Sequence, residues 1–332
     1  MRNIGYIIKR LGSMNYRAML EKTQSIHKKT GRNRLWLLQD MLRCASRYGA
    51  GYMDYDLYEM YDLTDAQRDT YLTRGRNNAL ILKYNTKENF HYFDNKDEFY
   101  GIFNEFLRRD WLLVKNWDND AFTAFVEKHP VFIVKPIDGS CGKGVERIKT
   151  ADFADTAAVV SHLKALGDNY IVEELITQHP DVSAIYPNAI NTVRMVSIHK
   201  DGVTHIICAY FRIGNNGKHV DNFNAGGMVA PVDEATGIVR APAIDKTKVL
   251  YQNHPATGSP IQGFQFPFWE EAKEMVRQAA GRVDGMGYIG WDIAFAPDGP
   301  KIVEGNNFPG HDIYQLPEHT PDRIGMMPKF NV

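Results

Sequence analysis

Two acidic residues near the C-terminus are spaced so that they could hold a metal ion. In "YIGWDIAFAPDGPKIVEGNNFPG", two strand-like runs flank a Pro-Asp-Gly turn at 297–299, which predicts a hairpin with a three-residue loop. With the turn centred on its aspartate, Asp292 lies opposite Glu304, and both side chains share one face with Asn306. Two like charges so placed are unfavourable unless a cation lies between them, and such oxygen ligands suit Mg²⁺ shared with phosphates. A solvent-facing pair is the alternative.

A second stretch has the composition of a phosphate-binding loop. Residues 131–148, "VFIVKPIDGSCGKGVERI", predict two strands joined by a glycine-rich tip, with Lys135 at the end of the first strand and Lys143 in the tip. Glycines allow backbone N–H groups to converge on an anion, and the lysines add positive charge, so a polyphosphate is the expected ligand. A tight hairpin turn without a ligand is the alternative.

A third stretch could contact a nucleotide base. The run "NYIVEELI" predicts a buried strand that ends in Glu173, Glu174, Leu175 and Ile176. The edge of such a strand offers backbone donors and acceptors beside apolar side chains, which suits the rim of an adenine ring. Asp181 follows at a distance suited to a ribose hydroxyl. An ordinary strand end with exposed glutamates is the alternative.

The elements that must position these residues belong to a mixed globular chain. With 332 residues, 44% hydrophobic and 24% charged, it can bury a core of two or three domain-sized units. We expect helix from about Tyr16 to Tyr48, short helices after Asp54 with an N-cap at Thr64 and Asp65, and alternating short strands and helices from residue 77 onward. The sequence shows neither an apolar run of about 18 residues nor a secretory pattern, so we expect a cytoplasmic protein.

Charge is distributed unevenly along the chain. Residues 1–49 contain eleven basic and two acidic residues, a net charge of +9, although the whole chain carries only -1. This segment could be a solvated helix face packed on the body, or it could contact an anionic membrane surface or an acidic protein partner. Membrane association therefore remains open. No basic and aromatic pattern of a nucleic-acid module is present, and we expect no nucleic-acid partner.

Taken in order, these motifs resemble the ATP-grasp enzymes, and in particular their sugar-transfer-associated branch, which is related to polysaccharide biosynthesis. The resemblance covers about residues 77–330 and rests on "IVKPIDGSCGKGV", "YIVEELITQHP", "NAINTVRMVSI", "FNAGGMVAPVDEATG" and "GWDIAFAPDGPKIVEGNNFPGHDIYQ". It implies an α+β fold in which two α+β subdomains clasp ATP after a helical N-terminal segment. The expected boundaries are 1–76 for the basic helical segment, 77–130 for the first part of the body, 131–185 for the lid subdomain and 186–332 for the C-terminal subdomain with the metal site.

The resemblance also implies roles for individual residues. Those expected to bind the nucleotide are Lys96, Lys135, Ser140, Gly142, Lys143, Gly144, Glu173, Glu174, Leu175, Ile176 and Asp181. Asp292, Glu304 and Asn306 match the magnesium ligands. Arg194 in "NTVR" and Arg212 in "YFR" are expected to face the transferred phosphoryl group or the acyl phosphate. For His219 a general-base role and a surface position both remain open.

The expected activity is that of an ATP-dependent carboxylate–amine ligase that forms a C–N bond through an acyl phosphate and releases ADP, with ATP and Mg²⁺ as cofactors. The expected substrates are a small-molecule or sugar-linked carboxylate and an amine, in the modification of a polysaccharide or sugar precursor. Two alternatives are a phosphotransferase with a hydroxyl acceptor and a membrane-proximal scaffold that binds a nucleotide without turning it over.

Overall fold

The computed structural model describes residues 15–138, 144–218 and 220–332. The expectations placed on Ser140, Gly142, Lys143 and His219 lie outside the described residues. The chain divides into two compact units. One, here called the helical unit, comprises the chain up to Lys83 together with Gly310–Val332, and the other, the sheet unit, comprises Tyr84–Pro309.

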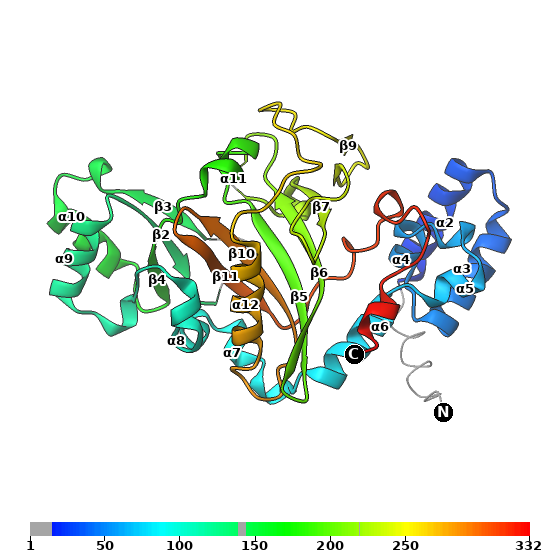
Figure 1. The fold of residues 1–332 in the computed structure, drawn as a ribbon, viewed down its shortest axis with the longest axis horizontal. Helices are drawn as coiled ribbons and strands as arrows, with labels where there is room; N and C mark the ends of the chain where they lie inside the picture. The colour runs from blue at the N-terminus through cyan, green and yellow to red at the C-terminus, as the bar shows by residue number, and fades with distance from the viewer. Residues whose placement is uncertain (1–14, 139–143, 219) are drawn as a thin grey trace. The chain divides into compact units, whose positions relative to one another are not determined.

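The helical unit is built from short helices and carries no strand among its described residues (Figure 1). Its helices are α2 (Tyr16–Thr30), α3 (Arg34–Tyr48), α4 (Tyr52–Leu57), α5 (Asp65–Asp69), α6 (Arg74–Tyr84), which runs to the boundary with the sheet unit, and 3₁₀ helices at Met60–Asp62, Pro317–His319 and Met327–Phe330. Thr64 caps α5 as predicted, accepting a hydrogen bond from the backbone N–H of Gln67. The helical N-terminal segment is confirmed.

The predicted long helix from Tyr16 to Tyr48 is two helices in the structure. α2 ends at Gly31, whose φ of +72° lies in the left-handed region that glycine adopts without strain. Asn33 then caps α3 by accepting from the N–H groups of Leu35 and Trp36. The Gly-Arg-Asn turn therefore reverses the chain and lets α2 and α3 pack against each other.

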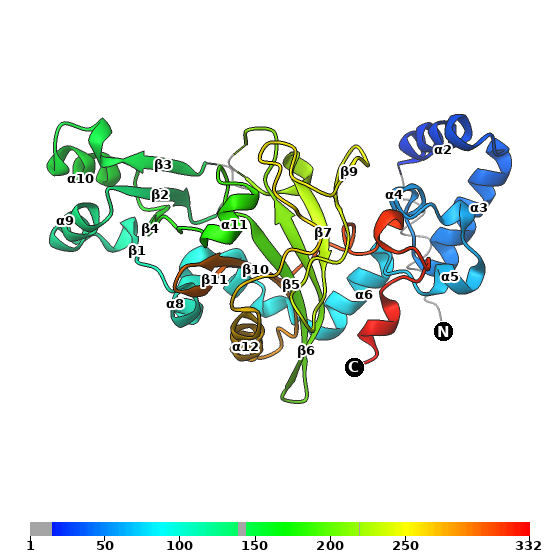
Figure 2. The same cartoon turned by 45° about the horizontal axis from the view of Figure 1, so that its top comes forward.

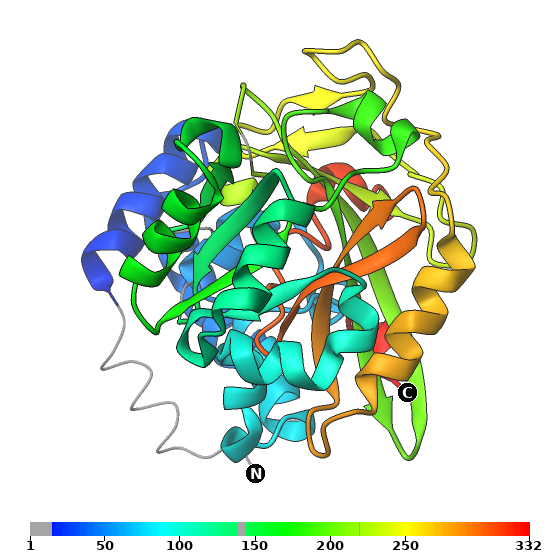
Figure 3. The same cartoon turned by 90° about the vertical axis from the view of Figure 1, so that its left-hand side faces the viewer.

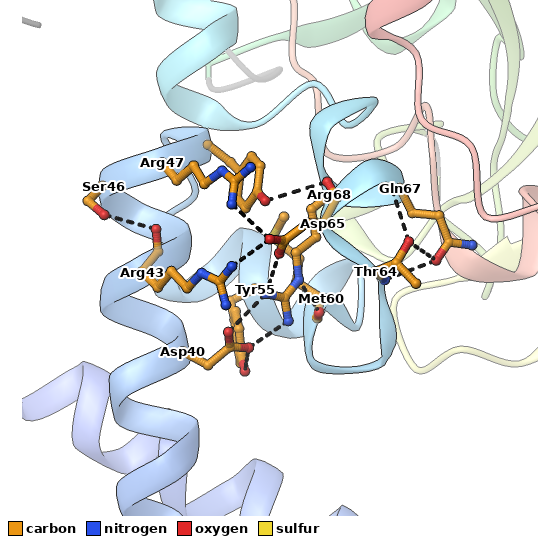
Figure 4. Close-up of polar contacts among 11 residues, drawn as sticks. Asp40, Arg43, Ser46, Arg47, Tyr55, Met60, Thr64, Asp65, Gln67 and Arg68 are labelled. Atoms are coloured by element: carbon orange, nitrogen blue, oxygen red, sulfur yellow. Dashed lines mark hydrogen bonds and ion pairs between the residues drawn. The ribbon is translucent and has the colours of Figure 1, made fainter.

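Some of the positive charge of this unit is paired within it. Acidic residues from the following segment pair with basic residues of α2, of α3 and of the turn between them, through Lys22–Asp56, Lys29–Glu59, Arg32–Asp62, Arg43–Asp65 and Arg47–Asp65. A buried pair lies beneath them, in which the Arg68 guanidinium donates to both carboxylate oxygens of Asp40 at 2.9 and 2.7 Å (Figure 4). Tyr55 donates to the same carboxylate at 2.7 Å. Part of the positive charge seen in residues 1–49 is thus paired inside the helical unit.

The C-terminal segment completes the helical unit. His311 contacts Asp54 at 2.9 Å, and the Tyr58 hydroxyl donates to the carbonyl oxygen of His311 at 2.9 Å. Gln315 pairs with both backbone groups of Leu72. Tyr55, Tyr58 and Tyr61 pack in the apolar core of this unit. The predicted boundaries placed residues 310–332 with the C-terminal subdomain, whereas these contacts place them with the helical unit.

The sheet unit contains two antiparallel sheets (Figures 1 and 2). The small sheet has the strand order β1-β4-β2-β3, from β1 (Trp111–Leu113), β2 (Val131–Pro136), β3 (Glu146–Lys149) and β4 (Tyr170–Glu174). Helices α9 (Asn119–Lys128) and α10 (Thr156–Ala165) cover one of its faces and share an apolar core with it. β2 and β3 are the two strands predicted around the glycine-rich tip.

The large sheet has seven strands in the order β11-β10-β5-β6-β7-β8-β9. They are β5 (Thr192–Lys200), β6 (Val203–Ile213), β7 (Met228–Val232), β8 (Ala243–Asp245), β9 (Leu250–Tyr251), β10 (Tyr288–Ala296) and β11 (Gly299–Asn306). The other helices of the unit are α7 (His91–Asp94), α8 (Lys96–Leu107), α11 (Pro180–Ile185) and α12 (Trp269–Ala280), with 3₁₀ helices at Lys87–Asn89, Val114–Asn116, Thr150–Asp152 and Phe223–Ala225. α8 and α12 bury their apolar faces in the core of the large sheet. The predicted α+β class is confirmed.

The hairpin β10–β11 is drawn in orange in Figure 3. Its strands have the predicted pairing of Asp292 with Glu304, but the loop and the register around it differ from the prediction. Ala296 pairs with Gly299, so the loop has two residues rather than the three predicted, and Gly299 adopts a φ of +124°. A register shift next to Asp292 leaves Val303 as an extra residue on β11, a β-bulge. The bulge restores the offset, and Asp292 lies opposite Glu304 as predicted.

Candidate active site

One face of the large sheet brings the predicted metal ligands together. Asp292 and Glu304 are cross-strand neighbours, and Gly290 lies opposite Asn306. The Asn306 amide nitrogen donates to Glu304 at 3.4 Å and to the Gly290 carbonyl oxygen at 3.2 Å. Two carboxyl groups and one carboxamide therefore cluster at the end of the hairpin, on strands that belong to a rigid sheet.

Both predicted arginines bind the same carboxylate. Arg194 is the β5 neighbour of Asp292. Its Nε and Nη2 groups donate to the two carboxylate oxygens of Asp292, the Nη2 bond at 2.9 Å. Arg212, from β6, donates to Asp292 at 2.5 Å. The two guanidinium groups hold the pKa of Asp292 far below its ordinary range, although burial by itself would raise it. Asp292 is thus ionised, and the arginines are fixed on the face that carries Glu304.

Asp221 anchors the second arginine. Its carboxylate accepts from Arg212 at 3.0 Å, and from both the backbone N–H, at 3.1 Å, and the hydroxyl of Thr192. Burial raises the pKa of Asp221, and the Arg212 charge opposes that shift. Arg212 therefore lies between two buried carboxylates, which restricts its side chain to one direction.

Gly290 leaves room for Arg194. A Cβ atom at this position would lie 3.1 Å from Cδ of Arg194 and 3.3 Å from Cβ of Pro309. Any larger side chain would push the arginine away from the strand. A glycine inside a buried strand often marks such a close approach, and in "YIGWD" it was the one sequence signal for this contact.

The donor set fits a hard divalent cation. The residue Glu304 as a whole is solvent-exposed, but protein atoms closely surround its carboxyl group. The resulting loss of hydration and the Asp292 charge both raise the pKa of Glu304. Carboxylates brought this close repel each other, and a divalent cation bound between them would remove that repulsion. Asp292, Glu304 and Asn306 are the residues that would hold Mg²⁺.

The predicted nucleotide lysines form a second group. Lys135 is 9% exposed at the end of β2, and its ammonium group contacts Glu173 at 2.7 Å. Lys96, at the start of α8, donates to the carbonyl oxygen of Ile137 at 3.0 Å. Burial lowers the pKa of Lys96, the nearby charge of Lys135 lowers it further, and Glu304 opposes both effects. Lys96 is thus close enough to both Lys135 and Glu304 to interact with them electrostatically.

The side chain of Glu173 lies in a buried cluster of charged groups. The pattern predicted that Glu173 lines the adenine, but its side chain is buried with Lys135, Arg109 and Tyr100. Burial would raise the pKa of this carboxyl group, and the Lys135 and Arg109 charges more than offset that, lowering it to about 2. Glu173 therefore fixes Lys135 through its side chain, and only the backbone of Glu173 could face a base.

The remaining predicted nucleotide contacts lie around the same strand end. Glu174 is half-buried and accepts from the backbone N–H of Asp110 at 3.1 Å, while Leu175 and Ile176 are half-buried. Asp181 is exposed on the first turn of α11. Gly144 has a φ of +71°, and a Cβ there would lie 2.9 Å from the ring of Pro136, so the chain requires glycine at this position just before β3.

Two residues of the site escaped the sequence reasoning. Arg109 follows α8 in "LRRDW", next to a second arginine, and nothing in the pattern distinguishes a buried guanidinium from an exposed one. Asp221 lies in the polar loop "HVDNFNAGG", where an aspartate is equally typical of a turn. Both are defined by partners that are distant in sequence.

The fold belongs to the α+β class, and the family follows from a direct comparison. The model of the sugar-transfer associated ATP-grasp family matches residues 75–321. The chain therefore belongs to this family, which confirms the resemblance drawn from the motifs. No curated protein matches the chain.

Solved ATP-grasp structures are similar to the chain only distantly. The ATP-grasp ligase PsnB, solved with a minimal precursor, Mg and ADP, is 17% identical with a TM-score of 0.40, over 68% of this chain and 54% of that chain. The D-alanine–D-alanine ligase from Coxiella burnetii is 10% identical with a TM-score of 0.43, over 72% and 56% respectively. This chain thus spans about half the length of each, and likenesses this weak carry no argument about activity.

Proposed function

We propose that the protein is an ATP-dependent ligase that joins a carboxylate to an amine and releases ADP and phosphate. One observation carries the proposal most directly. Asp292 and Glu304 lie opposite each other on neighbouring strands, with Arg194 and Arg212 fixed on the same face. This arrangement concentrates oxygen ligands and cations where a phosphoryl group would be transferred.

The proposed reaction has two balanced steps. A carboxylate oxygen of the first substrate attacks the γ-phosphorus of ATP, the bond from that phosphorus to the β-phosphate oxygen breaks, and ADP leaves with those electrons. The amine nitrogen then attacks the acyl carbon, the carbon–oxygen bond to phosphate breaks, and phosphate leaves while the amine loses a proton. Because hydroxide is a poor leaving group at neutral pH, the first step is what makes the second possible.

The residues of the chain act by position and charge. Lys135 and Lys96 would bind the triphosphate, and Arg194 and Arg212 would neutralise the transferred phosphoryl group and the acyl phosphate. Mg²⁺, held by Asp292, Glu304 and Asn306, would neutralise charge on the phosphate oxygens. The backbone at 175–176 and the Asp181 carboxylate remain the proposed adenine and ribose contacts.

The substrate class is proposed from the family alone. Its description as sugar-transfer associated supports a carboxyl-bearing sugar or a polysaccharide precursor as one substrate. The acidic partner or membrane surface considered for residues 1–49 stays outside the proposed function, because five basic side chains of α2, of α3 and of the turn between them already pair within the helical unit. None of the helices in the described part of the chain combines the length and apolar character of a membrane span.

The test is incubation of the full chain with ATP, Mg²⁺ and pooled carboxylates and amines, with ADP and free phosphate measured separately. A ligase releases both only when an acid and an amine are present together. A phosphorylated product formed without free phosphate would replace the ligase by a phosphotransferase. Nucleotide binding without turnover on any pool would favour the alternative of a scaffold that binds a nucleotide without turning it over.

Variants tie that activity to the site. Lys135→Ala should raise the ATP concentration needed for half-maximal turnover, because Lys135 is the buried cation proposed to bind the triphosphate. Lys149→Ala is the matched control, since Lys149 is an exposed lysine on β3 of the same sheet. Equal ATP requirements in the two variants would remove Lys135 from the proposed site.

A further inference from the structure

The side chain of Arg109 connects the two sheets of the sheet unit. It lies just after α8, with 1% of its side chain exposed, and all of its nitrogens donate. Toward the small sheet, Nε donates to Glu173 at 2.9 Å and Nη2 to the Tyr100 hydroxyl at 2.7 Å. Toward the large sheet, Nη1 donates to the carbonyl oxygen of Ile302 at 2.7 Å and Nη2 to that of Val303 at 3.4 Å.

Two sets of Arg109 contacts, Glu173 on one side and the carbonyls of residues 302 and 303 on the other, lie next to residues of the proposed active site. Its small-sheet partner Glu173 uses its other carboxylate oxygen to hold Lys135 at 2.7 Å. Its large-sheet partners, the carbonyls of residues 302 and 303, come immediately before Glu304. Val303 is the bulged residue, so it has no partner in the β10 register, and its carbonyl is available to a side chain.

The chemistry of the guanidinium matters here. Arginine presents five donors in a rigid plane, so one side chain can satisfy partners in two directions at fixed angles, which a lysine cannot do. The buried network formed by Lys135, Arg109 and Glu173 carries two positive charges and one negative charge. The extra positive charge is favourable where a polyphosphate binds and unfavourable without one.

We propose that Arg109 is a positioning residue that couples the nucleotide lysine Lys135 to the magnesium ligand Glu304. Through one guanidinium, the position of the small-sheet lysine depends on the position of the metal-binding strand. Mg²⁺ and nucleotide then bind cooperatively, because each orders the side of the site that the other needs. This inference rests on the proposed function, since it uses the roles proposed there for Lys135 and Glu304.

The experiment measures ADP binding to the full chain by calorimetry, once with Mg²⁺ and once with EDTA. The readout is the dissociation constant of ADP in EDTA divided by its dissociation constant in Mg²⁺. This ratio reports the coupling between metal and nucleotide. Arg109→Lys should reduce this ratio at least about fivefold. A residue with only a structural role would change both constants in the same proportion and leave the ratio unchanged.

Arg108→Lys is the matched control, because Arg108 is the exposed neighbour that pairs with Glu271 at 2.5 Å. Its ratio should equal that of the native chain. A folded Arg109→Lys protein with the native ratio would overturn the inference. If that variant does not fold, Tyr100→Phe removes only the hydroxyl shared by Arg109 and Glu173, and a native ratio there has the same meaning.

The two levels of the hypothesis fail in different ways. If the native chain does not bind ADP with either Mg²⁺ or EDTA, the proposed function fails and this inference with it. If the native chain shows Mg²⁺-dependent binding that Glu304→Gln removes, while Arg109→Lys leaves the ratio intact, only the role of Arg109 is refuted.

Discussion

Replacing Glu173 by glutamine should destabilise the sheet unit by an amount that depends on pH. The substitution removes the one negative charge between the buried cations Lys135 and Arg109. The pKa of Glu173 falls from its ordinary 4.5 to about 2 in the folded protein, and each tenfold change in proton affinity is worth about 1.4 kcal/mol. The ionised carboxylate therefore contributes about 3 kcal/mol, within the range for breaking a buried pair.

The direction of the pH dependence follows from the lowered pKa. A carboxyl group that is more acidic in the folded state than in the unfolded state stabilises the protein fully above pH 4.5. This contribution is lost as the pH falls through 4.5 toward 2, because the folded protein must then also bind the proton. The difference between the native chain and Glu173→Gln should accordingly be about 3 kcal/mol at pH 7 and about half as large near pH 3.

The assay is guanidinium denaturation followed by tryptophan fluorescence at several pH values. Trp111 packs edge-on against Tyr100, with ring centroids 5.3 Å apart, so it reports on this network. Glu174→Gln serves as the control, because that half-buried side chain accepts from the backbone N–H of Asp110, and its replacement should cost about 1 kcal/mol at every pH. A loss in Glu173→Gln that is the same at pH 7 and pH 3 would refute the electrostatic reasoning.

Three further substitutions test other parts of the structure. Glu304→Gln should weaken Mg²⁺-dependent nucleotide binding about tenfold or more, because it removes a proposed ligand charge, and calorimetry measures this. Gly290→Ala should lower turnover about tenfold with little change in stability, because the added Cβ displaces Arg194; steady-state kinetics and a thermal melt separate the two effects. Asp40→Asn should destabilise the helical unit by about 3 to 5 kcal/mol, because it leaves the Arg68 charge buried without its anion, and denaturation followed by circular dichroism measures this.

Each of these has an outcome that would contradict it. Native Mg²⁺ dependence in Glu304→Gln would remove this residue from the metal site. A Gly290→Ala protein with native turnover would show that Arg194 can move without cost. For the buried pair the control is Asp62→Asn, whose partner Arg32 is 40% exposed, so its loss should be about 1 kcal/mol or less. Equal losses in the two aspartate variants would show that burial does not govern the pair.

Local patterns were sufficient where the chemistry is decided by neighbours along one hairpin. The alternation of apolar and polar residues on both sides of residues 297–299 predicted that Asp292 and Glu304 share a face, because side chains in a strand alternate with a period of two. The β2–β3 strands around the glycine-rich tip and the cap at Thr64 were also predicted from neighbouring residues. Glycine, proline and capping residues act on the backbone within a few positions, so their effect is visible in the sequence.

The sequence does not show where a shorter loop and a β-bulge offset each other. The loop between β10 and β11 is one residue shorter than predicted, and a bulge at Val303 adds that residue back. Counting from a turn could not distinguish the two arrangements, because both place Asp292 opposite Glu304. The difference matters, since the bulge is what makes the Val303 carbonyl available to Arg109.

What only the tertiary structure decided is how charges from distant segments are paired. The amino-acid sequence alone determined the family, the fold class and the candidates for nucleotide and metal binding. It did not determine that Glu173 faces Arg109, that both arginines converge on Asp292, or that residues 310–332 complete the helical unit. A buried charge is stable only beside its counter-charge, and strands and helices far apart in sequence bring those partners together when they pack.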